Sequence, residues 1–359
     1  MTRNTFISIF GVLALLILIT TGIFLYAQGY RLDFRQRTLT ATGIILAKSL
    51  PEGAQVYLDG ELTTATNSTL SGVKPGTYQV KIERDGYFPW EKNIEVKAGL
   101  VTEIIALLPP LSPSLTAVTQ EGARLVTSAP SGVKAAFLSK NKLYLLSLTD
   151  QLFGFLRTSP QEIGSEPTGF SFAQASELLF SPNEDQIALS SQGKTILFDL
   201  DQPTPQTVNN PTELAAAWRE TINDQKTKRI QQLGISEELK AQALSPSTLW
   251  SPDEEMFLYA KQEEPRLTWW VADATSNQKI WEADDTQLKL FWLADSKHFV
   301  MIENETVSLL DLDGSNKRDL FKGTLTETVS LSSADLSRII ILTSISPNAP
   351  ANLYAISLR

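Results

Sequence analysis

The sequence contains no cysteine and only one histidine, His298, among its 359 residues. The absence of cysteine excludes disulfides, thiolate nucleophiles and thiolate metal sites. A single imidazole cannot form a multi-histidine metal site, and it leaves one candidate base for a Ser–His–Asp triad. The chain also lacks a glycine-rich phosphate loop and a Gly-x-Ser-x-Gly motif. We therefore expect no metal, no cofactor and no catalytic residues, and we interpret the protein as a non-enzyme.

Acidic residues outnumber basic ones, but the charge is unevenly distributed. The formal net charge is −9, and the first 50 residues contain five of the 31 basic residues and only one of the 40 acidic residues. The remainder of the chain therefore has a net charge of −13. A body this acidic repels phosphate backbones, so nucleic acid is not an expected partner. The length and the 42% hydrophobic content predict two or three folded domains.

One long apolar run lies near the N-terminus, at residues 5–27, and no charged residue interrupts it. At ~1.5 Å per residue, a helix of this length can span the ~30 Å hydrocarbon core of a membrane. We predict a membrane anchor at 1–30, with its transmembrane helix at about 5–27, and a juxtamembrane linker at 31–42. A cleaved signal peptide is the alternative, but its apolar core would be shorter, ~7–15 residues, and Leu25-Tyr26-Ala27 is a poor cleavage site.

The flanking charges and the composition disagree on which side of the membrane the body lies. The N-terminal flank has Arg3, whereas the C-terminal flank has Arg31, Arg35 and Arg37. The positive-inside rule therefore favours a cytoplasmic body. The absence of cysteine suits an exported one. We favour a single-pass plasma-membrane protein whose large C-terminal part is extracytoplasmic, with a cytoplasm-facing scaffold as an alternative.

Residues 43–108 change to a pattern of alternating apolar and polar side chains. Tyr78, Val80 and Ile82 alternate with polar residues, and Asp-Gly and Pro-Gly pairs separate the alternating segments. Period two predicts strands with one buried face, and about seven short strands predict a small sandwich. We expect Val80 on the buried face.

The motifs of this segment resemble the PEGA domain, a small β-sandwich of bacterial and archaeal surface proteins. They are Pro-Glu-Gly-Ala at 51–54, Val-Lys-Pro-Gly-Thr-Tyr at 73–78 and Asp-Gly-Tyr-Phe-Pro-Trp at 85–90. The chain has Thr64-Ala65 where the family usually has Thr-Pro, so this loop is expected to differ. The resemblance implies a surface location and a structural or adhesive role, with no catalytic residues. Tyr87, Phe88 and Trp90 form an aromatic cluster that either stacks on a sugar or partner or packs into the sandwich.

A repeat follows the proline-rich linker at 109–114. Each copy has an apolar lead, a Ser-Pro-Asp-like turn and a hydrophobic strand; the copies lie at 129–132, 180–185, 250–253, 292–296 and 333–335. Partner strands are expected at 142–148, 195–200, 267–272, 306–312 and 352–358. A period near 40 with about four strands per unit is typical of a β-propeller blade. The motifs resemble the TolB-type propeller repeat, and the resemblance covers most of 112–359.

The interval between the second and third copies is longer than the others and predicts a helical hairpin at 211–244. Asn210 can cap a helix that begins at Pro211, and Gly234 ends it. A second short helix is expected to begin at Ser236. The apolar residues at near-helical spacing are Leu214, Trp218, Ile222 and Ile230. They either pack on the rim of the propeller or form a docking surface for a partner.

Two features could indicate chemistry, and for each we favour a structural interpretation. The segment from Asp311 to Asn316 contains acidic residues near a glycine, but the spacing does not fit a calcium-binding EF-hand loop, so we predict a hairpin turn. His298 lies within a predicted strand, where we interpret it as a structural residue.

The fold class predicted is therefore mostly β: a transmembrane helix, a PEGA-type sandwich at 43–108, and a five- or six-bladed propeller at 115–359 with a helical insertion. The expected function is a membrane-tethered extracytoplasmic binding or scaffold protein of the cell envelope. Its expected partners are the membrane and another envelope protein or cell-wall polymer, with possible contacts at Tyr87, Phe88, Trp90 and Trp218. One alternative is a propeller-type envelope enzyme acting on glycans through carboxylates.

Overall fold

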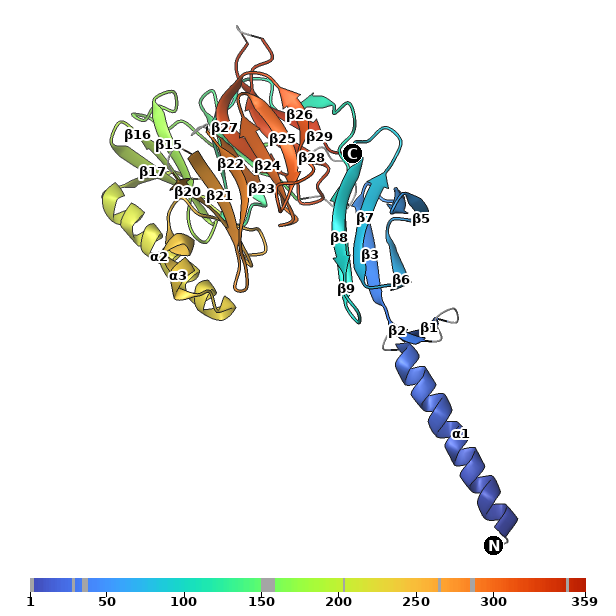
Figure 1. The fold of residues 1–359 in the computed structure, drawn as a ribbon. Helices are drawn as coiled ribbons and strands as arrows, with labels where there is room; N and C mark the ends of the chain where they lie inside the picture. The colour runs from blue at the N-terminus through green and yellow to red at the C-terminus, as the bar shows by residue number, and fades with distance from the viewer. Residues whose placement is uncertain are drawn as a thin grey trace. The chain divides into compact units, whose positions relative to one another are not determined.

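The computed structural model describes residues 3–27, 30–33, 38–149, 159–202, 204–263, 266–284, 288–346 and 349–359 (Figure 1). By its internal contacts the chain divides into two units, 1–108 and 109–359.

The N-terminal unit begins with helix α1, Arg3–Ala27, which has 25 residues and includes the whole of the apolar run. Among the residues that the structure describes, no helix is both long and apolar enough to cross a membrane. Two short strands follow, β1 (Tyr30–Asp33) and β2 (Thr38–Ala41), and they pair antiparallel. Most of this small sheet falls in the segment 31–42, for which we expected a linker.

Two sheets form the β-sandwich of the N-terminal unit. One has the order β6-β3-β9, in which β3 pairs antiparallel with β6 and parallel with β9. The other has the order β5-β4-β7-β8 and is antiparallel throughout. The strands are β3 (Gly43–Leu50), β4 (Gln55–Leu58), β5 (Glu61–Ala65), β6 (Ser68–Val73), β7 (Gly76–Glu83), β8 (Trp90–Val96) and β9 (Val101–Leu107).

The sandwich core follows the period-two pattern of its strands. Val56, Val80 and Ile82 are fully buried, whereas on β7 the neighbouring Gln79 is exposed and Lys81 is only partly buried. They pack with Ile45 from β3 and Ile104 from β9 on the opposite sheet. The prediction that Val80 lies on the buried face is therefore confirmed.

The C-terminal unit contains five four-stranded sheets within its described residues. Sheet I is β11 (Arg124–Ser128), β12 (Lys134–Ser139), β13 (Lys142–Ser147) and β14 (Gln161–Ser165). Sheet II is β15 (Ala175–Phe180), β16 (Gln186–Ser191), β17 (Lys194–Asp199) and β18 (Gln206–Val208). Sheet III is β19 (Leu249–Trp250), β20 (Phe257–Glu263), β21 (Arg266–Ala272) and β22 (Asn277–Ala283). Sheet IV is β23 (Lys289–Trp292), β24 (His298–Glu303), β25 (Thr306–Asp311) and β26 (Arg318–Lys322).

Sheet V joins the two ends of this unit. It contains β27 (Leu325–Ser332), β28 (Arg338–Thr343) and β29 (Asn352–Ser357), and its fourth strand is β10 (Leu115–Ala117), which pairs with β29. Apolar clusters lie between neighbouring sheets, connecting I with II, I with V and III with IV. This is the arrangement of a five-bladed β-propeller whose first strand completes its last blade. The sequence left five or six blades open, and the strand order of the described residues gives five.

The repeated turn of the sequence has one backbone geometry in all five sheets. It joins the first strand of each sheet (β27 in sheet V) to the strand that follows it in the chain. In every copy the amide of its first residue donates to the carbonyl five residues later, and the carbonyl of that first residue accepts from the amide three residues later. Its fourth residue has a positive φ in every copy; these residues are Gly132, Glu184, Glu254, Ser296 and Leu336. In three copies the first residue is a buried serine whose hydroxyl accepts a hydrogen bond from the backbone where the next strand begins, over 3.0–3.1 Å; these are Ser181, Ser251 and Ser333. This shared geometry explains why the repeated turn is easy to recognise in the sequence.

The insertion between sheets II and III forms the predicted helical hairpin. Helix α2 is Pro211–Leu233 and helix α3 is Glu237–Leu244. The Asn210 side chain accepts a hydrogen bond from the Glu213 amide, and Gly234 ends α2 in the left-handed conformation. Figure 1 shows both helices, in yellow, beside the strands of sheet III. Ile230, Ile235 and Ala243 form a buried cluster with Phe257, Tyr259 and Ala272 of that sheet.

Candidate functional site

A cavity of about 1230 Å³ lies where the five sheets of the propeller converge. Its lining comes from the last residues of β11, β15, β19, β23 and β27, which are the first strands of the five sheets, and from the turns that follow them. We call this space the central cavity. Because every sheet contributes to its wall, the central cavity is the place where a ligand would contact the whole ring.

Helix α2 closes part of the central cavity. The residues that line it from α2 include Ile222, Lys226 and Arg229, which lie on one face of the helix because they are three or four positions apart. The Arg229 side chain donates hydrogen bonds to the carbonyl oxygens of Glu254 (2.8 Å) and Asp253 (3.2 Å) in the turn of sheet III. The C-terminal part of α2 is therefore fixed to the rim of the cavity by polar contacts and by the buried Ile230.

Hydrogen bonds between neighbouring turns connect the rim of the cavity. The Ser131 hydroxyl donates to Glu184 (2.9 Å) between sheets I and II, and the Asp253 amide donates to the Ser296 hydroxyl (3.1 Å) between sheets III and IV. The Ala294 amide donates to Ser332 (2.9 Å), and the Ala334 amide donates to the carbonyl of Leu148 (2.9 Å), which joins sheet V to its two neighbours. Within the described part of the chain, no such bond joins the turns of sheets II and III. The helical insertion enters the chain between these two sheets.

The acidic side chains around the cavity already have partners. Glu184 accepts from Ser131, and Asp253 accepts from the Ser251 hydroxyl over 2.5 Å. The Asp295 carboxylate contacts the ring of His298 over 2.6 Å. Burial raises the pKa of Asp295, but the hydrogen bond and charge of His298 more than offset this, so its pKa is lowered.

Lys226 differs from these groups, because among the described residues nothing forms a hydrogen bond or an ion pair with it. It is half-buried, and burial lowers the pKa of its ammonium group. The apolar part of the wall is also incompletely covered. Leu179 and Leu249 are 42% and 39% exposed, although both lie on the first strands of their sheets. The cavity thus combines an unpaired cation with uncovered apolar surface.

The aromatic residues singled out in the sequence do not form one site. Trp90 is only 4% exposed and packs in the sandwich core, so its ring is not available for stacking on a ligand. Tyr87 and Phe88 are half-buried, and the Arg84 guanidinium lies 5.6 Å from the centre of the Tyr87 ring. Trp218 is half-buried on α2, but it is absent from the lining of the central cavity.

Sequence reasoning missed Lys226 and Arg229. The available signal was their position: with Ile222 and Ile230 they lie on one side of the predicted helix. The helix could therefore have been expected to present a mixed apolar and basic face. Which surface that face covers depends on the packing of α2 against sheet III, and the sequence does not contain that information.

The two features of sheet IV that could suggest chemistry are structural. The turn after β25 is held by its own side chains: the Ser315 hydroxyl donates to Asp313 (2.6 Å) and Asn316 donates to Asp311 (3.0 Å). His298 is 2% exposed between Asp295 and Asp311, whose nearest oxygens are 2.6 and 3.6 Å from its ring nitrogens. No group of acidic or histidine side chains suited to a metal ion occurs in the described residues.

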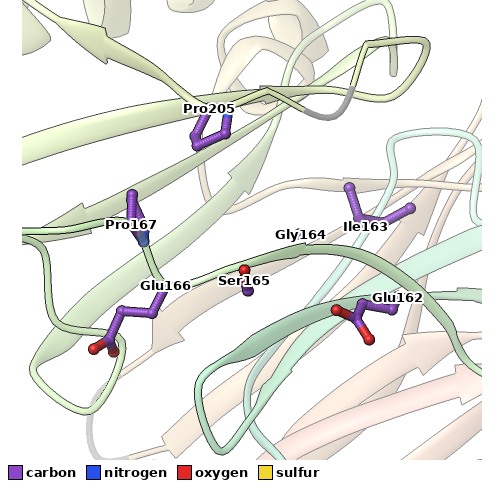
Figure 2. A pocket seen from close by; sticks show the side chains of 7 residues that line it. All are labelled: Glu162, Ile163, Gly164, Ser165, Glu166, Pro167 and Pro205. Atoms are coloured by element: carbon purple, nitrogen blue, oxygen red, sulfur yellow. The ribbon is translucent and has the colours of Figure 1, made fainter.

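A second, smaller pocket of about 450 Å³ lies beside β14 at the outer edge of sheet I. Figure 2 shows Glu162 and Glu166 on either side of Ser165, with Pro167 and Pro205 at the other wall. The Glu162 carboxylate binds Lys142 (2.6 Å), and Glu166 accepts from the Phe172 amide (2.6 Å). Because its two charged groups are already engaged, this pocket is a weaker candidate than the central cavity.

No curated protein matches the chain. Among solved structures, a putative TolB from Agrobacterium tumefaciens is 14% identical, with 65% of this chain and 77% of that chain covered and a TM-score of 0.26. An oligogalacturonate lyase in complex with manganese is 8% identical, with 79% and 86% covered and a TM-score of 0.33. TolB from Acinetobacter baumannii is 16% identical, with 78% and 60% covered and a TM-score of 0.25. The family model of the PEGA domain matches residues 42–112, so the sandwich of the N-terminal unit is a PEGA domain.

Proposed function

We propose that this protein is a membrane-tethered, extracytoplasmic binding protein of the cell envelope that holds a segment of another envelope protein in its central cavity. The observation that carries the proposal is the cavity itself. All five sheets and the inserted helix α2 line it, and apolar side chains remain exposed inside it. Such a concave, partly apolar surface with a few placed polar groups is typical of a binding site.

Three further observations support this proposal. The PEGA domain at 42–112 suits a surface protein. Helix α1 carries exposed large apolar side chains, such as Phe10 (68% exposed) and Leu18 (72% exposed), and a lipid environment would cover them. Finally, the carboxylates of Glu184, Asp253 and Asp295 beside the cavity have partners within the protein, which favours binding over catalysis. The protein is not an enzyme under this proposal.

The proposed binding site can be tested by photo-cross-linking in intact membranes. A photoreactive amino acid replaces Leu249 inside the cavity, and the matched control carries it at Lys322, which is exposed on the outer strand of sheet IV. We expect a discrete cross-linked protein only from position 249. Equal products from both positions, or none from 249, would contradict a binding role for the cavity.

The proposed location needs a separate experiment. Intact cells are treated with a protease, and the residues from 45 onward are followed by mass spectrometry. We expect cleavage in exposed loops of both domains before the cells are opened. Protection of the whole segment until lysis would instead support the cytoplasm-facing alternative. N-terminal sequencing of the membrane-bound protein checks the anchor, since a sequence beginning near Gly29 would show that the apolar segment had been removed.

A further inference from the structure

Lys226 lies at the position where α2 closes the central cavity, and its ammonium group has no bonding partner among the described residues. A half-buried, unpaired charge costs free energy, because the surrounding protein replaces part of its hydration shell. The lowered pKa of Lys226 reports the same cost. A ligand with a negative charge at this position would offset this free-energy cost.

The other charged groups that line the cavity do not need such a ligand. Arg229 is bound to two backbone carbonyls and lies 3.8 Å from the carboxylate of Glu254. Glu184, Asp253 and Asp295 are held as described above. Lys228 also lines the cavity but is exposed, so water can solvate its charge. Among the described residues that line the cavity, the half-buried and unpaired positive charge is therefore that of Lys226.

The surroundings of Lys226 also limit what the rest of the ligand can be. Ile222 lies one helical turn before it on the same face of α2. Leu179 and Leu249 also line the cavity, and they are 42% and 39% exposed. An anion alone would leave this apolar surface uncovered. The surface instead favours a ligand in which apolar groups flank the negative charge.

Size distinguishes a peptide from a small molecule. Small-molecule sites occupy ~300–1,000 Å³, whereas the central cavity has about 1230 Å³. The net charge of −13 outside the first 50 residues repels anions at long range. Recognition of an acidic group must therefore come from a short-range contact inside the cavity, and Lys226 is placed to make it.

We infer that the central cavity selects a peptide segment in which an acidic side chain is flanked by apolar side chains, and that Lys226 binds the carboxylate. This inference rests on the proposed binding function of the cavity. It adds the chemical class of the segment and the residue that determines specificity. The contact is a charge-assisted hydrogen bond between the lysine ammonium and the carboxylate, in a site from which α2 excludes part of the solvent.

The test uses the full-length protein purified in detergent and two unlabelled peptides, acetyl-Ser-Leu-Glu-Leu-Ser-amide and its Gln counterpart. Isothermal titration calorimetry measures both affinities. We expect the Glu peptide to bind about tenfold more tightly. Lys226→Met, which keeps the length of the side chain but removes its charge, should abolish this preference. The matched control Arg219→Met changes an exposed basic residue of the same helix that is absent from the cavity lining, and it should keep the preference.

The possible results separate the inference from the proposed function. If both peptides bind equally, or if the preference survives in Lys226→Met, the cavity binds peptides but not through this contact, and only the inference fails. If neither peptide binds while dodecanoate binds in a Lys226-dependent way, the ligand is a lipid carboxylate and the peptide class is wrong. If no probe binds but the Leu249 cross-link is still found, the binding function stands and the inference fails. Loss of both results removes the binding function as well.

Discussion

The PEGA sandwich and the propeller are both built from alternating strands, yet they differ in how completely the inward-facing residues are covered. In the sandwich, Val56, Val80 and Ile82 are fully buried, because a second sheet packs directly on them. In the propeller, Leu179 and Leu249 lie on the first strands of their sheets and still expose about two-fifths of their surface. Five sheets that converge on one axis bury their sides against one another but leave the axis open. The same alternating sequence pattern therefore forms a closed core in one domain and leaves an open, partly apolar cavity in the other.

The largest expected effect lies in the closed core. Val80→Asp would bury an unpaired carboxylate between the two sheets of the sandwich, and we expect a loss of several kcal/mol in the stability of this domain. Hydrogen exchange of the full-length protein, measured by mass spectrometry, should show loss of protection in β7. The control Gln79→Asp places the same charge on the exposed neighbouring position and should have little effect. Protection that is unchanged in Val80→Asp would mean that the buried face has been assigned incorrectly.

The second prediction concerns which half of α2 contributes to the stability of the propeller. Ile230 is 3% exposed and packs on sheet III, so Ile230→Ala should cost about 2–4 kcal/mol. Leu214 is half-buried near the other end of the helix, and Leu214→Ala should cost less than about 1 kcal/mol. Denaturant unfolding of the full-length protein measures both. Equal losses would show that the whole helix is integrated into the propeller, and the N-terminal half of α2 could then not be a docking element.

The helical insertion also shows which structural features can be predicted from the sequence and which cannot. Its boundaries, its Asn210 cap and its Gly234 stop are local signals, so they could be predicted from the residues. The five turns were predictable for the same reason, since each depends on hydrogen bonds within six residues. The exposure of Leu249 and the unpaired state of Lys226 were not predictable. They depend on how five sheets and a helix meet, and an alternating pattern indicates the inward face of a strand without indicating what covers it.

The third prediction concerns close packing between neighbouring sheets of the propeller. Gly314 lies in the turn after β25 with φ of +80°, and a Cβ atom there would overlap the carbonyl oxygen of Ile280 in sheet III. Gly193 has a similar φ of +76° in the turn after β16, but nothing lies within 4 Å of its Cβ position. Gly193→Ala should therefore cost about 1 kcal/mol from backbone strain alone.

Gly314→Ala should cost roughly 2–3 kcal/mol, because the overlap adds to the same strain. The difference in midpoint between the two variants in denaturant unfolding isolates the contribution of close packing between sheets III and IV. Equal midpoints would show that the two sheets separate readily at this position.

The smallest expected effect is the stability cost of keeping Lys226 unpaired in the open part of the propeller. Its pKa is lower in the folded protein than in the unfolded chain, where it is about 10.4. Below the folded pKa both states carry the proton, and the folded state bears the full cost of the buried charge. Lys226→Met removes this cost, so we expect the variant to be more stable than the wild type at neutral pH, on the order of 0.5 kcal/mol.

As the pH rises through the lowered pKa of Lys226, the folded wild type loses its proton before the unfolded chain does, and its stability increases relative to the variant. The advantage of Lys226→Met should therefore shrink between that pKa and about 10.4. Thermal unfolding of both proteins across this range measures the effect, and Lys228→Met should show no such trend. A variant that is less stable at neutral pH would mean that Lys226 already has a stabilising partner, and the free positive charge on which the selectivity of the cavity depends would not exist.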